Sequence, residues 1–142
     1  MQLPLFLLLL TISSNASPTI RNVDWRPACD GANIEVVSDQ SKILSVSASA
    51  VHSAVIVQWT IHYMDGIPVT AEFREYDRGR ILEGDKAGEY SGINTLKRLE
   101  TFQWKESGFS VPDKTLNDEL SGILAKIRGE QKAAGDSKKP SN

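Results

Sequence analysis

The segment Val55–Phe73, VIVQWTIHYMDGIPVTAEF, contains two runs in which apolar and polar residues alternate. The runs Val55–Tyr63 and Ile67–Phe73 are separated by a short turn that includes Asp65-Gly66. A period of two places successive side chains on opposite faces of a β-strand. Asp-Gly between two such runs is a strong signal for a β-hairpin. The segment therefore predicts an antiparallel hairpin with one buried face, and it places Trp59 in the core.

The length of the hairpin loop decides which residues face each other across the two strands. A two-residue loop of Asp65 and Gly66 would pair Trp59 with Glu72 and mix apolar with polar side chains. A three-residue loop with Gly66 in the left-handed region pairs Trp59 with Ala71 instead. Every cross-strand pair on one face is then apolar, so the sequence favours the three-residue loop with a bulge.

Weaker strand signals lie on both sides of this hairpin. Ile34–Val37 is mostly apolar, and Leu44–Ala50 alternates apolar residues with serines, which predicts a strand with one buried face. Arg80–Leu82 follows the turn Asp77–Gly79 and is a further short candidate. Together these segments predict an antiparallel β-meander of four to five strands. Residues 17–33 are expected to form an irregular lead-in.

One or two C-terminal helices are expected to pack on one face of the sheet. Ile93–Phe102 has roughly helical apolar spacing, with an edge strand over Leu99–Trp104 as the alternative. The last helix follows Pro112, and Thr115-x-x-Asp118 fits a capping box. Its apolar stripe ends before Gly129 and consists of Leu116, Leu120, Ile123, Leu124 and Ile127.

These signals predict a single α+β domain over residues 34–129. Residues 130–142 have no large apolar side chain and are expected to be a disordered polar tail.

The N-terminal segment has the features of a secretory signal. Leu3–Ile12 is nearly all apolar and uncharged, but it is shorter than the roughly 20 apolar residues that span a bilayer. Ser14 and Ala16 fit the small-x-small pattern that precedes a signal-peptidase cut. We therefore expect residues 1–16 to be a signal peptide, the product to be secreted, and no membrane span to remain after processing.

Charge and cysteine content limit the classes of partner. Removal of residues 1–16 from the 142-residue chain leaves 126 residues with a net charge near −2. This balance argues against nucleic-acid binding through bulk positive charge. Cys29 is the only cysteine, so no internal disulfide can form, whereas small secreted domains usually carry several. Either Cys29 stays a thiol in a monomer, or it links two chains, or the protein works in a reducing compartment.

The sequence contains no motif for metal binding, for a catalytic nucleophile or for a phosphate-binding loop, so we expect no metal and no cofactor. The expected register brings His62, Glu72 and Arg74 together on the polar face of the hairpin, with Gln58 opposite Glu72. Small ribonucleases use such a set for acid–base chemistry and phosphate binding. The favoured interpretation is an ordinary solvated sheet face.

An interaction protein without enzymatic activity fits these observations best. Trp25 and Trp104 are candidate partner contacts because aromatic anchors dominate interfaces, and His62 and Arg74 are further candidates. The leading hypothesis is a secreted effector-type protein, such as a fungal virulence effector, that binds a host protein and is translocated into the host cell. The alternatives are an extracellular binding or protease-inhibitor module and a small secreted hydrolase such as a ribonuclease.

Overall fold

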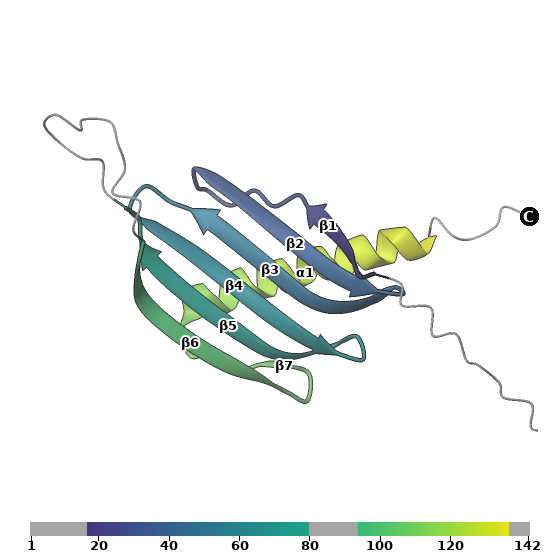
Figure 1. Ribbon diagram of the computed structural model, residues 1–142. Helices are drawn as coiled ribbons and strands as arrows, with labels where there is room; N and C mark the ends of the chain where they lie inside the picture. The colour runs from purple at the N-terminus through teal and green to yellow at the C-terminus, as the bar shows by residue number, and fades with distance from the viewer. Residues whose placement is uncertain (1–16, 80–93, 137–142) are drawn as a thin grey trace, which may run out of the picture.

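An antiparallel sheet forms one layer of the molecule and a long C-terminal helix forms the other (Figure 1). The computed structural model describes residues 17–79 and 94–136. Within these residues each strand pairs with the next in sequence, so the sheet is a seven-stranded meander. The strands are β1 Thr19–Val23, β2 Gly31–Asp39, β3 Lys42–Val51, β4 Val55–Met64, β5 Ile67–Asp77, β6 Thr95–Lys105 and β7 Gly108–Phe109, and the helix is α1 Lys114–Asp136.

The predicted meander with a C-terminal helix is confirmed, but the strands are more numerous than expected. Residues 17–33, expected to be irregular, contain β1 and the start of β2. β1 is short, and only Val23 among its residues is buried, so its sequence carries little periodic signal. The predicted signal peptide, the short strand over Arg80–Leu82 and the end of the tail over 137–142 lie outside the described residues.

The region Ile93–Phe102 was predicted first as a helix, with an edge strand as the alternative. In the described part of this region the chain forms β6, so the strand is the correct prediction. The side of β6 that faces α1 carries Arg98 and Glu100 as well as Phe102. These two charged residues form an ion pair at 2.9 Å. Because charged residues occupy inward positions, the apolar period of two is hidden in the sequence.

The turn between β4 and β5 differs from the three-residue loop that the sequence favoured. Met64 pairs with Ile67, so the loop consists of Asp65 and Gly66 alone. Their φ angles are +52° and +77°, the left-handed conformation that a type I′ hairpin turn requires. Glycine adopts this conformation without steric cost, and Asp is one of the few other residues that tolerates it.

A bulge in β5 just beyond this turn places apolar residues of β4 and β5 opposite each other. The sequence prediction had obtained such apolar pairs from a longer loop instead. The register shifts by one residue between His62 and Tyr63, which leaves Val69 as the extra residue. Trp59 consequently pairs with Phe73 rather than with Ala71. The sequence reasoning identified the face that must be buried but placed the irregularity in the loop instead of in the strand.

A second bulge corrects the prediction for β3. Val37 pairs with Ser45 and Ser38 pairs with Ile43, so Leu44 is the extra residue. Leu44 was expected on the buried face and is 41% exposed, whereas Ile43 is 2% exposed. The alternation of the remaining residues, from Val46 to Ala50, is confirmed.

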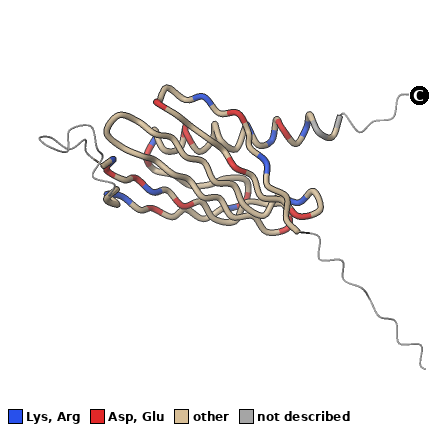
Figure 2. Tube along the Cα trace, turned by 45° about the horizontal axis from the view of Figure 1, so that its top comes forward, with Lys and Arg blue, Asp and Glu red and all other residues tan. Residues whose placement is uncertain are grey.

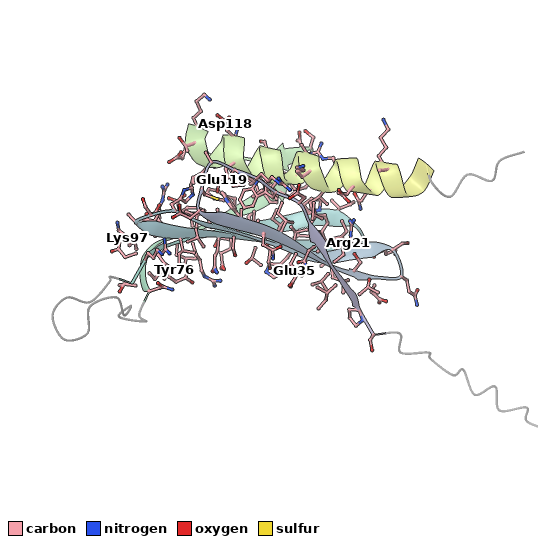
Figure 3. The ribbon with its side chains drawn as sticks, turned by 90° about the horizontal axis from the view of Figure 1, so that it is seen from above. Arg21, Glu35, Tyr76, Lys97, Asp118 and Glu119 are labelled. Carbon is pink, nitrogen blue, oxygen red and sulfur yellow. The ribbon has the colours of Figure 1, made fainter. Side chains whose placement is uncertain are left out.

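The core lies between one face of the sheet and α1. Trp59 is at its centre, 1% exposed, with its ring centroid 5.0 Å from that of Phe73 and 6.0 Å from that of Phe102. α1 contributes the whole predicted stripe, Leu116, Leu120, Ile123, Leu124 and Ile127. No described element covers the other face of the sheet, here called the open face, from which Glu35 and Tyr76 project in Figure 3.

α1 begins and ends at other residues than the sequence indicated. Its N-cap is Asp113, whose Oδ1 accepts a hydrogen bond from the backbone N–H of Leu116 at 3.1 Å, so Thr115 does not start a capping box. The helix continues through Gly129 to Asp136, and residues 130–136 are therefore helical rather than disordered. An ion pair between Arg21 of β1 and Glu130 at 3.5 Å supports this extension. None of the described helical residues form a segment long and apolar enough to cross a membrane.

Candidate functional site

The polar set predicted on the hairpin, His62, Glu72 and Arg74, lies on the open face. Glu72 and Arg74 form an ion pair at 2.6 Å. His62 is exposed, and within the described chain it forms no hydrogen bond or ion pair with either of them. Gln58 stands opposite Arg74 rather than opposite Glu72, because of the bulge near the turn. The three groups thus share the open face, where Glu72 and Arg74 pair with each other and His62 stays apart.

The two tryptophans proposed as partner contacts are each half-buried. Trp25 packs against the core from the segment between β1 and β2. Trp104 meets Phe109 of β7 edge-on, with ring centroids 5.0 Å apart, and lines a hollow of about 150 Å³ beside α1. Each ring therefore has a packing role, and partner binding by either stays a prediction.

Cys29 is a free, half-buried thiol just before β2. Its Sγ donates a hydrogen bond to the carbonyl oxygen of Gly31 at 3.3 Å. The thiol packs against the edge of the core, which is an ordinary environment for an unpaired cysteine.

A cleft that the sequence did not reveal lies where α1 begins above the sheet. It has a volume of about 360 Å³ and is open to solvent. Its floor is apolar and is made by Val55 and Val57 of β4, Phe73 of β5 and Leu116 of α1. Its rim is polar and contains His52, Glu75, Arg98, Asp113, Thr115 and Glu119. We call this the helix-start cleft.

Among the described residues, Arg98 is the only Lys or Arg that lines the helix-start cleft, and it already has partners. Its guanidinium contacts Glu100 at 2.9 Å and Asp113 at 3.3 Å. It also lies over the ring of Phe73, 5.6 Å from the centroid, which is within the range of a cation–π contact. The backbone N–H of Leu116 and then Arg98 lower the pKa of Asp113. Arg98 is thus held in place between the sheet and the helix start.

Glu119 reaches from α1 toward the sheet, as Figure 3 shows, whereas its neighbour Asp118 projects away from it. The Glu119 Oε1 accepts a hydrogen bond from the indole Nε1–H of Trp59 at 2.5 Å. This bond satisfies the only polar group of a tryptophan that is otherwise enclosed in the core. It also fixes the Glu119 carboxylate at the cleft.

Glu75 stands directly across from Arg98 in the register of β5 and β6, yet the two side chains form no ion pair. Among the described residues Glu75 has neither a hydrogen-bond nor an ion-pair partner. The described residues that line the cleft include three carboxylates and one guanidinium, which together have a formal charge of −2 when His52 is left aside. The uncompensated negative charge is therefore greatest at Glu75.

His52 enters the cleft from the turn between β3 and β4. Its backbone N–H donates to the carbonyl oxygen of Val55 at 2.9 Å, and its own carbonyl oxygen accepts from Arg78 Nη1 at 3.3 Å. These bonds fix the turn that carries the imidazole. Across residues 17–79 and 94–136, no three His, Cys, Asp or Glu side chains are grouped so that they could hold a metal ion.

Comparison with protein-family models, with curated proteins and with solved structures found no match. The assignment of a function therefore depends on the cleft and on the sequence alone.

Proposed function

We propose that this chain is a secreted, non-enzymatic interaction protein that binds another protein by taking one of its basic side chains into the helix-start cleft. The observation that carries the proposal is Glu75, a carboxylate that has no partner among residues 17–79 and 94–136 and stands at the rim of a cleft with an apolar floor. An extended lysine or arginine side chain has both parts that such a cleft accommodates, an apolar stem and a charged head.

The arrangement of charges favours a cation over an anion. The guanidinium that the described residues bring to the cleft, that of Arg98, is already bound by Glu100 and Asp113, so it is not available to a ligand carboxylate or phosphate. Glu75 would make a charge-assisted hydrogen bond to an entering ammonium or guanidinium group, the stronger kind of polar contact. Val55, which is only half-buried, supplies apolar surface against which the stem would lie.

The biological setting of the proposal comes from the sequence. The N-terminal apolar segment supports secretion, and the single cysteine gives no sign of stabilisation by disulfides. An effector that enters a host cell and binds a host protein there combines these two properties. An extracellular binding module is the alternative setting, and the cleft would take the same kind of side chain in either place.

A ribonuclease is less well supported than a binding protein. His52, and not His62, lies in a cleft with carboxylates, but the net negative charge of that cleft opposes a phosphodiester substrate. On the open face, Arg74 already pairs with Glu72, and His62 bonds to neither of them among the described residues. Loss of RNA cleavage in His52→Ala, but not in His62→Ala, would be needed to revive this function.

The proposal is tested by locating a cationic probe on the protein by NMR. The probe is Nα-acetyl-lysine methylamide, and the matched anionic probe is Nα-acetyl-glutamate methylamide. We expect the lysine probe to shift the backbone amide signals of Val57, Phe73, Glu75 and Leu116, and the shifts to weaken at higher salt, because exposed charges are screened. Equal shifts with the glutamate probe, or shifts confined to the open face, would contradict the proposal.

A further inference from the structure

The outer edge of β6 is the longest unpaired strand edge in the described part of the chain. β7 pairs only with Trp104 and Lys105, which leaves Thr95–Gln103 without a strand partner on that side. No backbone hydrogen bond joins this stretch to another described segment apart from β5. A bulge at Lys97 interrupts the stretch, so the edge is regular from Arg98 to Gln103. The free N–H and C=O groups of such an edge are a template for pairing with another strand.

The turn that follows β6 shows which residues present their backbone groups outward. Lys105 pairs with Gly108 across the two-residue loop of Glu106 and Ser107, so the N–H and C=O of Lys105 point toward β7. Backbone groups alternate in direction along a strand, and β6 pairs regularly with β5 from Arg98 to Gln103. The N–H and C=O groups of Leu99, Thr101 and Gln103 therefore point away from the sheet.

At the centre of the free edge, Leu99 is flanked by two residues of opposite charge, Arg98 and Glu100. Leu99 is the middle residue of Thr95–Gln103, and its side chain is 51% exposed on the open face. An antiparallel partner with the same sequence, centred on Leu99, would place its Glu100 against Arg98 and its Arg98 against Glu100. Opposite charges directly across two antiparallel strands attract, whereas like charges repel.

We propose that a second copy of this chain pairs with the β6 edge, antiparallel, about a two-fold axis at Leu99. The two Leu99 residues exchange both backbone hydrogen bonds, and the two Arg98–Glu100 pairs form a symmetric set of four charges on the side of α1. The sheet becomes continuous across the two copies, and the helix-start clefts of both lie on the same face. The inference goes beyond the proposed function and does not depend on what the cleft binds.

The other edge of the sheet lacks this self-complementarity. β1 has five residues, and an antiparallel partner centred on its middle residue would place Arg21 against Arg21. Figure 2 shows basic and acidic residues close together along β6, where Arg98 and Glu100 stand on either side of Leu99 and can pair with the same two residues of a second copy. Charged residues on an edge usually oppose pairing, but here their order makes them complementary across the axis.

The register is tested by cross-linking in a Cys29→Ser background, which leaves no other thiol. We expect the purified chain to sediment as a dimer at high micromolar concentration, and Leu99→Cys to form a disulfide-linked dimer under mild oxidation. Thr101→Cys is the matched control, because two Thr101 residues would lie about 14 Å apart, from the rise of an antiparallel strand. A disulfide requires Cα atoms within about 7 Å.

Leu99→Pro tests the same edge without a cross-link. The N–H of Leu99 points outward, so proline removes no hydrogen bond to β5 and is tolerated at an edge position. We expect this variant to keep the circular dichroism of the folded chain and to lose the dimer. The proposal would be overturned if the chain were monomeric at every concentration, even if it paired with a different protein. Equal cross-linking of Leu99→Cys and Thr101→Cys would also overturn it.

Discussion

Trp59 connects the two layers of the molecule through an apolar ring and one polar atom. The ring packs on Phe73 and Phe102, and the indole N–H donates to Glu119 of the helix. Periodicity placed Trp59 in the core correctly, because its neighbours in β4 alternate regularly. Its acceptor could not be predicted, since Glu119 is 60 residues away and the two residues before it, Asn117 and Asp118, are equally polar.

Replacement of Glu119 by alanine should therefore destabilise the fold. The indole N–H of Trp59 would remain in the core without an acceptor, which costs about 1–3 kcal/mol in the free energy of unfolding. Glu119→Gln keeps an acceptor oxygen and should lose less. Urea denaturation measures the effect, with Asp118→Ala as the control because Asp118 makes only an exposed ion pair with Lys114. A loss as large in Asp118→Ala as in Glu119→Ala would contradict this role for the hydrogen bond.

At the scale of elements, the sequence predicted the strands and helix with regular apolar periods and missed those with irregular ones. The presence of the β4–β5 hairpin, though not its loop, and the stripe of α1 were predicted correctly, because most of their inward positions are apolar. The bulges at Leu44 and Val69 were missed, because an alternating pattern does not show where one extra residue is inserted. The sequence of β6 left helix and strand as alternatives, because Arg98 and Glu100 occupy inward positions, where they neutralise each other in an ion pair.

Gly129 decides between the predicted and the observed end of α1. In the structure it lies inside the helix, and a Cβ atom added there would meet open space. Gly129→Ala should thus stabilise the protein by about 0.5–1 kcal/mol, since glycine is less favourable than alanine in a helix interior. Thermal unfolding measures the change. If the helix instead ended in a left-handed residue at Gly129, the same substitution would lower the stability.

At the scale of the whole molecule, the helix-start cleft exists because distant segments meet. Phe73, Arg98 and Glu119 come from β5, β6 and α1, and each is ordinary in its own sequence context. The sequence directed attention to His62, Glu72 and Arg74, which share one hairpin. Residues that are close in sequence or in a predicted register can be grouped in advance, whereas a cleft between layers depends on how the helix crosses the sheet.

The affinity for a short peptide with one central lysine, measured by isothermal titration calorimetry, tests the central claim most directly. We expect Glu75→Gln to weaken binding about three- to tenfold, because the charge-assisted contact becomes a neutral one. Glu35→Gln is the matched control, since Glu35 lies on the open face, away from the cleft (Figure 3). Weaker binding in Glu75→Gln alone would support the cleft as the binding site. Equal affinity in all three proteins, or no binding by any of them, would contradict it.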